Sequence, residues 1–527
     1  MNNADQTQEN IELKQRLAAL ELQLSEQNVT LKKQDSALKK QDSALENKDH
    51  KIQTLEEYIR YMVQQRFGSS SEKLSADQIN LFDEAELLSD DDEPAEEEST
   101  NVPAHKRKKK RGSIPEELPR TEVIHDLSEA EKVCPHDGTA LRHFGNETSE
   151  QLDYIPAQMS VLQHVRRKYT CPCCNNYMVT ASKPAQPIEK SIASPGLLAQ
   201  VATHKYCDAL PLYRQAQIFK RFGVELDRTN LANWMIKCGV LIQPLINLMY
   251  ERAREGSLLH MDETVLQVLK ESERSAQQQS RMWVMTNSEC SARITLFHYS
   301  PTRKTSEADW MLGDFSGALM TDGYAVYDTV CKTKQLENLG CWAHARRYFK
   351  EARDAQGKEK AGKANTALAF IQKLFRIEKL SENKLIDEKY QIRQAQTVPL
   401  LDELRQWLDK TIKRPMNSEK LKKAVTYLHN QWPKLIRYAE NGAWPIDNNA
   451  AENAIRPMVV GRKNWLFAVT EKGAKASANL YSLVETAKAN NVEPSIYLKE
   501  VFTRLPAATC VEDVEVLLPW NITKVVV

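Results

Sequence analysis

A heptad repeat near the start of the chain constrains its fold more than any other sequence feature. Aliphatic residues recur at every seventh position, and the segment LKKQDSA occurs twice in succession, at residues 31–37 and 38–44. This period places one apolar seam along a supercoiled helix. We therefore predict a coiled coil at residues 1–67 that mediates self-association; one long solvated helix is the alternative. The repeating positions are Leu17, Leu24, Leu31, Leu38, Leu45, Ile52 and Ile59.

The rest of the chain is too long and too mixed in composition for one fold. It has 527 residues, of which 41% are hydrophobic and 27% charged, enough for several cores and some solvated stretches. The first ten residues, MNNADQTQEN, lack the pattern of a secretory signal, and no apolar run is long enough to span a membrane. Ten cysteines are too few for a disulfide scaffold. These features predict a cytoplasmic protein.

Charge is distributed unevenly, although the net charge is only +1. Eleven acidic residues and no basic one occur between Asp77 and Glu98, and the basic run KRKKKR follows at residues 106–111. Such blocks rarely fold. We predict a largely disordered linker at residues 68–120, whose basic run either contacts DNA phosphates or balances the acidic run beside it.

A cysteine cluster follows the linker and predicts a small zinc-ribbon-like module at residues 121–186. Cys171 and Cys174 have the C-x-x-C spacing with which two thiolates bind one zinc ion, and Cys134 supplies a third thiolate. Asp137 stands where a second C-x-x-C would end, so the fourth ligand is open: His136 and Asp137 are candidates, and Cys173 is a spare thiol. The alternative is a knuckle that packs without metal.

Two helical patterns around FGVEL predict a helix-turn-helix-like DNA-binding region at residues 187–254. Pro195 suits the first turn of a helix that follows Ser194, and Asp227 is positioned to cap the second helix of the pair. The exposed beginning of that helix would enter the major groove, so we predict DNA contacts from Arg214, Arg228 and Asn230. A helical bundle that never contacts DNA would show a similar pattern.

Three acidic residues have the surroundings expected of a metal-dependent phosphoryl-transfer site. Asp262 lies in the alternating run LLHMDETVLQVL, Asp322 ends a strand-like run before Gly323, and Glu452 follows Asp447, a candidate N-cap of a short helix. Carboxylates that face one another require a cation, and two such cations can activate a hydroxyl for attack at phosphorus. Other acids could substitute in this role, namely Glu263, Asp309, Asp314, Asp328 and Asp447.

The segments MDET, TDGYAVYD, GCWAHARRYF and DNNAAENAIRPMVVGRKNWLFA resemble the insertion-sequence-66 family of bacterial DDE transposases. The resemblance extends to FGSSSEKL, the cysteine cluster, LPLYRQAQIFKRFGVE and the closing LLPWN, so it covers nearly the whole chain. It implies a ribonuclease-H-like α/β core at residues 255–350 and 442–490, with Asp262, Asp322 and Glu452 as ligands of Mg²⁺ or Mn²⁺. A helical insertion at residues 351–441 and a C-terminal segment at residues 491–527 complete this multidomain α+β organisation.

The resemblance also implies a function and its partners. A transposase of this family would cleave transposon ends and transfer the freed 3′-hydroxyl to target DNA at the bacterial nucleoid, with accessory proteins of the same element. Arg456, Arg462 and Lys463 are predicted phosphate contacts; surface solvation is the alternative. Cys341 and His344 resemble a C-x-x-H element of some DDE enzymes, for which a structural role is expected. The competing functions are an inactive DNA-binding regulator and a coiled-coil assembly protein.

Overall fold

The chain is described by a computed structural model, and it divides into two compact units, Met1–Leu74 and Ser75–Val527. The structure describes residues only in the second unit. The predicted coiled coil and the predicted charged linker therefore lie outside the described residues. The described residues are 121–124, 132, 139–140, 143, 148–149, 151, 158–170, 178–287, 292–356, 362–414, 416 and 419–522.

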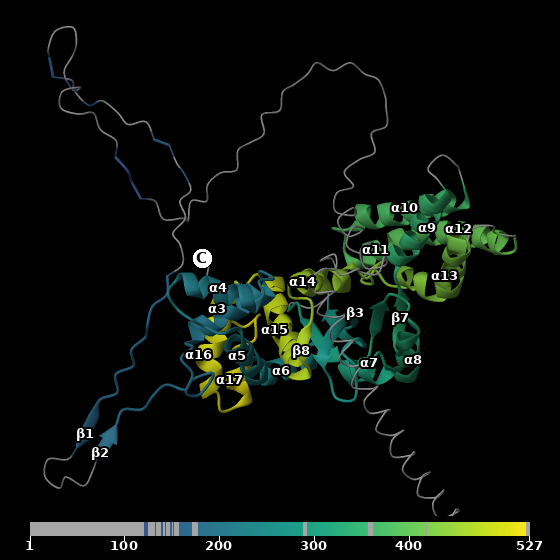
Figure 1. Cartoon of the computed structure of the whole chain (residues 1–527). Coiled ribbons are helices and arrows are strands. Elements are labelled where there is room, and N and C mark those ends of the chain that lie inside the picture. Colours follow the sequence, from purple (N-terminus) through teal and green to yellow (C-terminus); the bar gives the residue numbers. More distant parts are fainter. Residues whose placement is uncertain are drawn as a thin grey trace, which may run out of the picture. The chain divides into compact units, whose positions relative to one another are not determined.

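A mixed sheet lies at the centre of the larger unit (Figure 1). Three consecutive antiparallel strands are followed by two strands parallel to the first, giving the order β5-β4-β3-β6-β7. The short strand β8 pairs with the far end of β3. The strands are β3 (Leu258–Lys270), β4 (Gln279–Asn287), β5 (Thr295–Ser300), β6 (Ala318–Thr321), β7 (Glu337–Gly340) and β8 (Ala468–Thr470).

Both faces of the sheet are covered by helices that bury its apolar side chains. On one face Tyr327 of α8 packs edge-on against Trp283 of β4, with ring centroids 6.0 Å apart. On the other face α14 and α15 pack against β3 and β5. These helices are α7 (Thr305–Leu312), α8 (Ala325–Lys334), α14 (Asn449–Trp465) and α15 (Glu471–Ala489).

Helix α15 also protects the exposed edge of the sheet. An edge strand presents unpaired backbone groups that would otherwise pair with another chain. The backbone N–H of Phe297 donates to Ser482 Oγ at 2.7 Å, and that of Thr295 donates to Thr486 Oγ1 at 3.0 Å. Two backbone N–H groups of the edge strand β5 are therefore hydrogen-bonded to hydroxyls of α15.

Four helices precede the sheet and include the predicted helix-turn-helix pair. Ser194 caps α3 by accepting the N–H of Leu197, with Pro195 in the first turn as predicted. Gly223 has φ 79° in the turn between α4 and α5. Asp227 occupies the N-cap of α5, but its carboxylate accepts no capping hydrogen bond, which corrects that detail of the prediction. The helices are α3 (Pro195–Tyr206), α4 (Leu212–Arg221), α5 (Arg228–Leu241) and α6 (Gln243–Arg254).

Helix α5 is held tightly against the C-terminal half of the chain. A Cβ atom at Gly239 would lie 2.6 Å from the backbone of Ala476 in α15, so only glycine permits this crossing. The side chains of Leu231, Trp234 and Met235 are buried. The C-terminal helices complete the same core: α16 (Pro494–Arg504), η3 (Leu505–Ala507) and α17 (Val511–Glu515).

The described residues of the predicted insertion form helices joined by short turns, and these helices have a hydrophobic core of their own. Its helices lie together beside β7 (Figure 1). Buried leucines at helical spacing, such as Leu401, Leu404 and Leu408 of α12, form this core. The elements are α9 (Trp342–Gln356), α10 (Lys363–Ser381), α11 (Ile386–Ile392), η1 (Arg393–Thr397), α12 (Val398–Ile412), α13 (Glu419–Leu435) and η2 (Arg437–Glu440).

Two smaller findings concern the predicted zinc module and membrane spans. Strands β1 (Lys168–Thr170) and β2 (Met178–Thr180) pair antiparallel on either side of the segment that contains Cys171 and Cys174. Within the described ranges, no single helix is long and apolar enough to cross a membrane, although the bent pair α5–α6 passes by length and composition.

Candidate active site

The register of the sheet determines where the first two acids lie. His260 of β3 is the partner of Met320 in the parallel strand β6, so Asp262 and Asp322 stand two residues further on in each chain segment. Neighbouring strands are about 4.8 Å apart, and residues two apart on a strand face the same side. This register therefore places Asp262 and Asp322 at the same level of the sheet.

Asp262 is held by the backbone of its own strand. Its side chain is buried, with 8% of the residue exposed, and its Oδ1 accepts the N–H of Glu263 at 2.8 Å. It pairs across the ladder with Val284 of β4. These contacts fix the carboxylate within the sheet.

Asp322 begins the turn that follows β6. Its Oδ1 accepts the N–H of Tyr324 at 2.9 Å, which is an Asx-type turn. Gly323 between them has φ 88°, a backbone conformation that favours glycine, and an added Cβ would meet Gln431 at 2.9 Å. From the insertion, Tyr427 donates its hydroxyl to the backbone oxygen of Asp322 at 2.9 Å.

Glu452 lies in the first turn of α14 and is 5% exposed. The helix begins one residue later than predicted, with Asn448 and not Asp447 at the N-cap. Asp447 instead accepts the N–H of Asn449 at 3.1 Å. The helix also runs through Pro457 to Trp465, so the prediction of a short helix was wrong.

Asn448 connects this helix to the sheet, and sequence reasoning missed it. Its side-chain amide donates to the backbone oxygen of Met261 at 2.9 Å, and its Oδ1 lies 3.0 Å from Nδ1 of His260. Its backbone N–H donates to the sulfur of Cys341 at 3.2 Å. Asn448 is fully buried, and these bonds fix the beginning of α14 beside β3. Its position within the motif DNNAAEN was the available signal.

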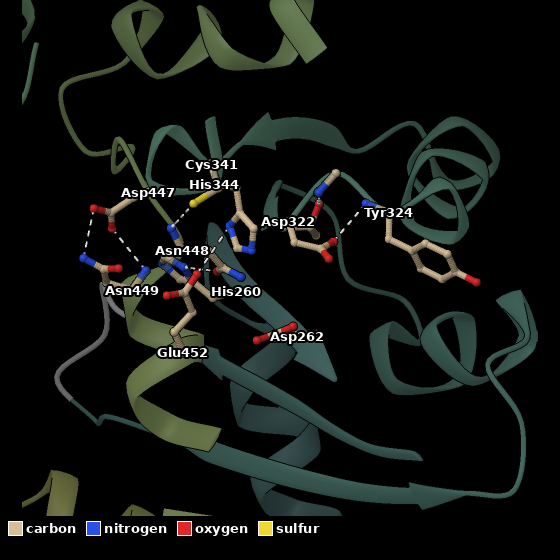
Figure 2. A network of polar contacts seen from close by, with 12 residues as sticks. His260, Asp262, Asp322, Tyr324, Cys341, His344, Asp447, Asn448, Asn449 and Glu452 are labelled. Atoms are coloured by element: carbon tan, nitrogen blue, oxygen red, sulfur yellow. Dashed lines mark hydrogen bonds and ion pairs between the residues drawn. The ribbon is translucent and has the colours of Figure 1, made fainter. Parts of the chain in front are cut away.

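Figure 2 shows Asp262, Asp322, His344 and Glu452 in one region, beside β3 and the end of β6. Burial raises the pKa of Asp262 well above its ordinary value, and the carboxylates of Glu263, Asp322 and Glu452 raise it further. Burial also raises the pKa of Asp322, although Arg303, Arg347 and Lys434 act against this. Buried negative groups that repel one another are a donor set that fits a divalent cation.

The acids considered as substitutes have other partners. Glu263 faces away from Asp262 and binds Arg303 and the hydroxyl of Tyr327. The exposed Asp309 pairs with Lys334 at 2.9 Å. Asp328 accepts a hydrogen bond from Asn338 at 2.8 Å and pairs with Lys434. Asp314 lies on the surface.

The predicted DNA contacts differ in their surroundings. Arg214, Arg228 and Asn230 are exposed on α4 and α5. Lys463 is exposed and Arg456 is partly buried on α14. Arg462, in contrast, is fully buried and donates to Thr264 Oγ1 at 3.1 Å and to the backbone oxygen of Val265. Its guanidinium therefore anchors α14 to β3, away from the surface where a phosphate would bind.

A second cluster of metal-ligating side chains shares Glu452. The ligand atoms of Cys341, His344 and Glu452 all lie within 4.8 Å of one another, and all three residues are buried. His344 Nδ1 is 3.4 Å from Glu452 Oε1. The four predicted zinc ligands, Cys134, His136, Cys171 and Cys174, lie outside the described residues.

Sequence comparison identifies the family of this chain. Residues 190–476 match the family described as Transposase IS66 family. Residues 131–175 match the zinc-finger binding domain of transposase IS66, residues 482–520 the IS66 C-terminal element, and residues 54–123 the Transposase C of IS166 homeodomain. The chain belongs to the IS66 family of transposases, as the sequence motifs predicted.

Two similar proteins from Sinorhizobium fredii are both described as uncharacterized. One, y4jD, is 29% identical over 78% of this chain and 81% of its own length. The other, y4qI, is 30% identical over 77% of this chain and 75% of its own length. The family match supports DNA as the partner and the use of a divalent metal, and the zinc-finger match supports zinc binding.

Proposed function

We propose that this protein cleaves the ends of its transposon and joins the freed 3′-hydroxyl to target DNA, with Asp262, Asp322 and Glu452 at the reacting phosphate. The observation that carries the proposal is the convergence of three acids, from β3, from the end of β6 and from α14, in one region of the fold. The three acids are separated in sequence by 60 and 130 residues, so only the tertiary fold brings them together.

The arrangement of the sheet supports a ribonuclease-H-like core. Three antiparallel strands are followed by two parallel strands, and helices cover both faces. The long helical segment between the second and third acids fits the insertion that the family resemblance implies. The proposed fold thereby explains why the third acid arrives on a helix.

The three carboxylates are the proposed ligands of Mg²⁺ or Mn²⁺. Divalent cations bound there would make the attacking hydroxyl a better nucleophile and would neutralise charge on the leaving oxygen. The chain's own residues position the acids: Tyr427 and Tyr324 hold Asp322, and Asn448 holds the helix of Glu452. Arg347 and Lys434 add positive charge beside Asp322.

The proposed reaction has two balanced steps. In the first, the oxygen of water attacks the phosphorus at the transposon end, and the bond from phosphorus to the 3′-oxygen breaks, leaving a 3′-hydroxyl. In the second, that hydroxyl attacks a phosphorus of the target strand, and the target's own 3′-oxygen leaves. Each step exchanges one phosphorus–oxygen bond for another, so no external energy source is required.

Replacing Asp322 by Asn tests the proposal. We expect Mg²⁺-dependent nicking of transposon-end DNA to fall by at least about 10³-fold, because loss of a metal ligand costs several kcal/mol of transition-state stabilisation. DNA binding in a gel-shift assay should persist. The matched control is Asp309→Asn, a substitution of an acid whose side chain is 55% exposed and should leave nicking unchanged.

The outcomes separate the competing functions. Undiminished nicking by the Asp322→Asn protein would refute the proposed site. A DNA-binding regulator would bind end DNA without nicking it, and an assembly protein would do neither.

We also propose that α4 and α5 bind the transposon end. The exposed beginning of α5 presents Arg228 and Asn230, and α4 presents Arg214. Replacing Arg228 by Ala should weaken binding to all sequences and lower the salt dependence of log K by about 1, as expected when one phosphate contact is lost. The measurement is the DNA-binding affinity across a series of salt concentrations. Lys332→Ala on α8 is the control. An unchanged slope of log K against log salt concentration for Arg228→Ala would exclude this contact.

The N-terminal parts complete the proposal. We infer that one Zn²⁺ is bound by Cys134, His136, Cys171 and Cys174. We also infer that residues 1–67 self-associate. The protein is proposed to act on DNA of the bacterial nucleoid, together with accessory proteins of its element. A chain truncated to begin at Gly68 should have a smaller oligomeric state by light scattering. An unchanged state would exclude the coiled-coil role.

A further inference from the structure

The C-x-x-H element has a geometry suited to metal binding. Cys341 precedes α9 and His344 lies in its first turn, so the two side chains share one end of that helix. Glu452 comes from α14, and the three ligand atoms lie within 4.8 Å of one another. Bound to one tetrahedral zinc ion, such atoms would be about 3.3–3.6 Å apart. The 3.4 Å between His344 Nδ1 and Glu452 Oε1 already has this value.

The state of His344 agrees with a ligand role. His344 is 7% exposed, and its Nδ1 is buried without a hydrogen-bond partner while facing the carboxylate. A buried polar atom of this kind costs free energy unless something binds it. Burial, aided by Arg347, lowers the pKa of His344 well below its ordinary value.

The surroundings of Cys341 resemble those of a bound thiolate. Its sulfur accepts the backbone N–H of Asn448 at 3.2 Å and also that of His344. Backbone donors of this kind orient and stabilise the ligands of a metal site. Burial nevertheless raises the pKa of Cys341 well above its ordinary value, and Glu452 and Asp447 raise it further. A divalent cation would supply the positive charge that this group lacks.

The donor set also selects the kind of metal. Mg²⁺ binds oxygen ligands and takes thiolates poorly, whereas Zn²⁺ and similar cations prefer sulfur and imidazole nitrogen. The carboxylate triad and this cluster therefore suit different cations. Glu452 belongs to both, so a cation at either position would compete for its carboxylate oxygens.

We propose that Cys341, His344 and Glu452 form a second metal site, selective for Zn²⁺ or a similarly thiophilic cation, and that its occupation withdraws Glu452 from the Mg²⁺ triad and inhibits strand cleavage. Binding exchanges the thiol proton for the metal: the S–H bond breaks, the proton leaves to solvent, and a sulfur–metal bond forms. The site itself rests on the geometry alone. Its inhibitory effect rests on the proposed function of the triad.

Cobalt binding tests the site without any catalytic assay. Co²⁺ replaces Zn²⁺ and gives a near-ultraviolet absorption band when a thiolate binds it. A full chain carrying Cys134→Ser, Cys171→Ser and Cys174→Ser lacks the three predicted thiolate ligands of the N-terminal zinc module. We expect this variant to bind one Co²⁺ that gives the thiolate absorption band. Added Zn²⁺ should abolish the band.

Matched variants identify the ligands. Cys341→Ser, made in that background, should lose the band, and His344→Asn should weaken Co²⁺ affinity by at least about 10-fold. Cys331→Ser is the control, because Cys331 is also buried but lies on α8 outside the cluster. Circular dichroism verifies that each variant is folded. No band in the parent, or an equal band in folded Cys341→Ser protein, would overturn the site.

Inhibition is measured separately with the otherwise wild-type chain. Zn²⁺ should inhibit Mg²⁺-dependent nicking, and the Cys341→Ser protein should require at least about 10-fold more Zn²⁺ for the same fractional inhibition. Equal zinc sensitivity of the two proteins would overturn the competition for Glu452. If the protein nicks no DNA at all, the proposed function fails while the cobalt result still decides whether the metal site exists.

Discussion

The sheet and the helical insertion each have a hydrophobic core, but they contribute differently to the site. The core around the sheet includes α3, α5 and α15, whereas the core of the insertion is formed by α9, α10, α12 and α13. All three acids of the proposed triad come from the sheet and from α14. The insertion supplies Tyr427, which supports one of them. The sheet region therefore carries the proposed catalytic acids, and the insertion supports the position of Asp322.

The two regions meet through a few specific contacts. The backbone N–H of Trp342 donates to Ile446 at 3.1 Å, and its indole N–H donates to the backbone oxygen of Leu435 at 2.8 Å. A small apolar cluster that includes Leu258, Met320 and Cys341 fills the junction. The segment that returns from the insertion to the sheet thus passes directly beside the proposed metal ligands.

Truncating one core residue in each region should give the largest effects and distinguish the two cores. Trp283→Ala removes a fully buried ring from β4 and should lower the free energy of unfolding by about 3–5 kcal/mol. Leu404→Ala in α12 should cost about 2–5 kcal/mol. We expect the second change to give an early calorimetric transition confined to the insertion, because Leu404 belongs to the core of the insertion. A single shared transition in both variants would show that the two cores unfold as one.

Asp447, which lies between η2 and α14, should make the free energy of unfolding depend on pH. Burial raises the pKa of Asp447 from its ordinary value to about 6. Between pH 4 and 6 the folded state therefore holds the proton more tightly than the unfolded state, so this group's contribution to stability falls as pH rises through that window. The loss is at most about 3 kcal/mol, and less because solvent reaches this partly buried side chain.

Asp447→Asn should remove that dependence while keeping an oxygen to accept the N–H of Asn449. Urea unfolding at pH 4 and at pH 7 measures the difference between variant and wild type. Asp309→Asn is again the exposed control. A wild-type protein that gains stability relative to Asp447→Asn between pH 4 and 7 would contradict the raised pKa.

The smallest expected effect concerns the hydrogen bond from Tyr427 of the insertion to the backbone of Asp322. Tyr427→Phe removes one hydrogen bond to the backbone of Asp322, worth about 1 kcal/mol, and should slow nicking about fivefold. Tyr390→Phe is the control, since Tyr390 is an exposed residue of α11 in the same insertion. Single-turnover nicking rates at saturating DNA separate this effect from binding. Equal rates for the two variants would mean that the insertion does not position Asp322.

Much of the organisation could be predicted because it depends on local patterns. The alternation around Asp262 predicted a strand, Gly323 predicted the end of β6, and the family resemblance carried by the local motifs implied the helical insertion. Local patterns failed where longer-range contacts decided the outcome. The predicted short helix instead continues through Pro457 to Trp465, because α14 packs against β3 and Arg462 donates hydrogen bonds to that strand.

The sequence alone determined the heptad seam, the order of strands and helices around the acids, and the family to which the chain belongs. The tertiary structure decided that Glu452 faces both Asp262 and His344, that Arg462 is buried, and that Tyr427 reaches Asp322. The physical reason is that periodicity specifies which face of an element is apolar. Strand register and helix packing specify which side chains, more than 100 residues apart in sequence, share that face.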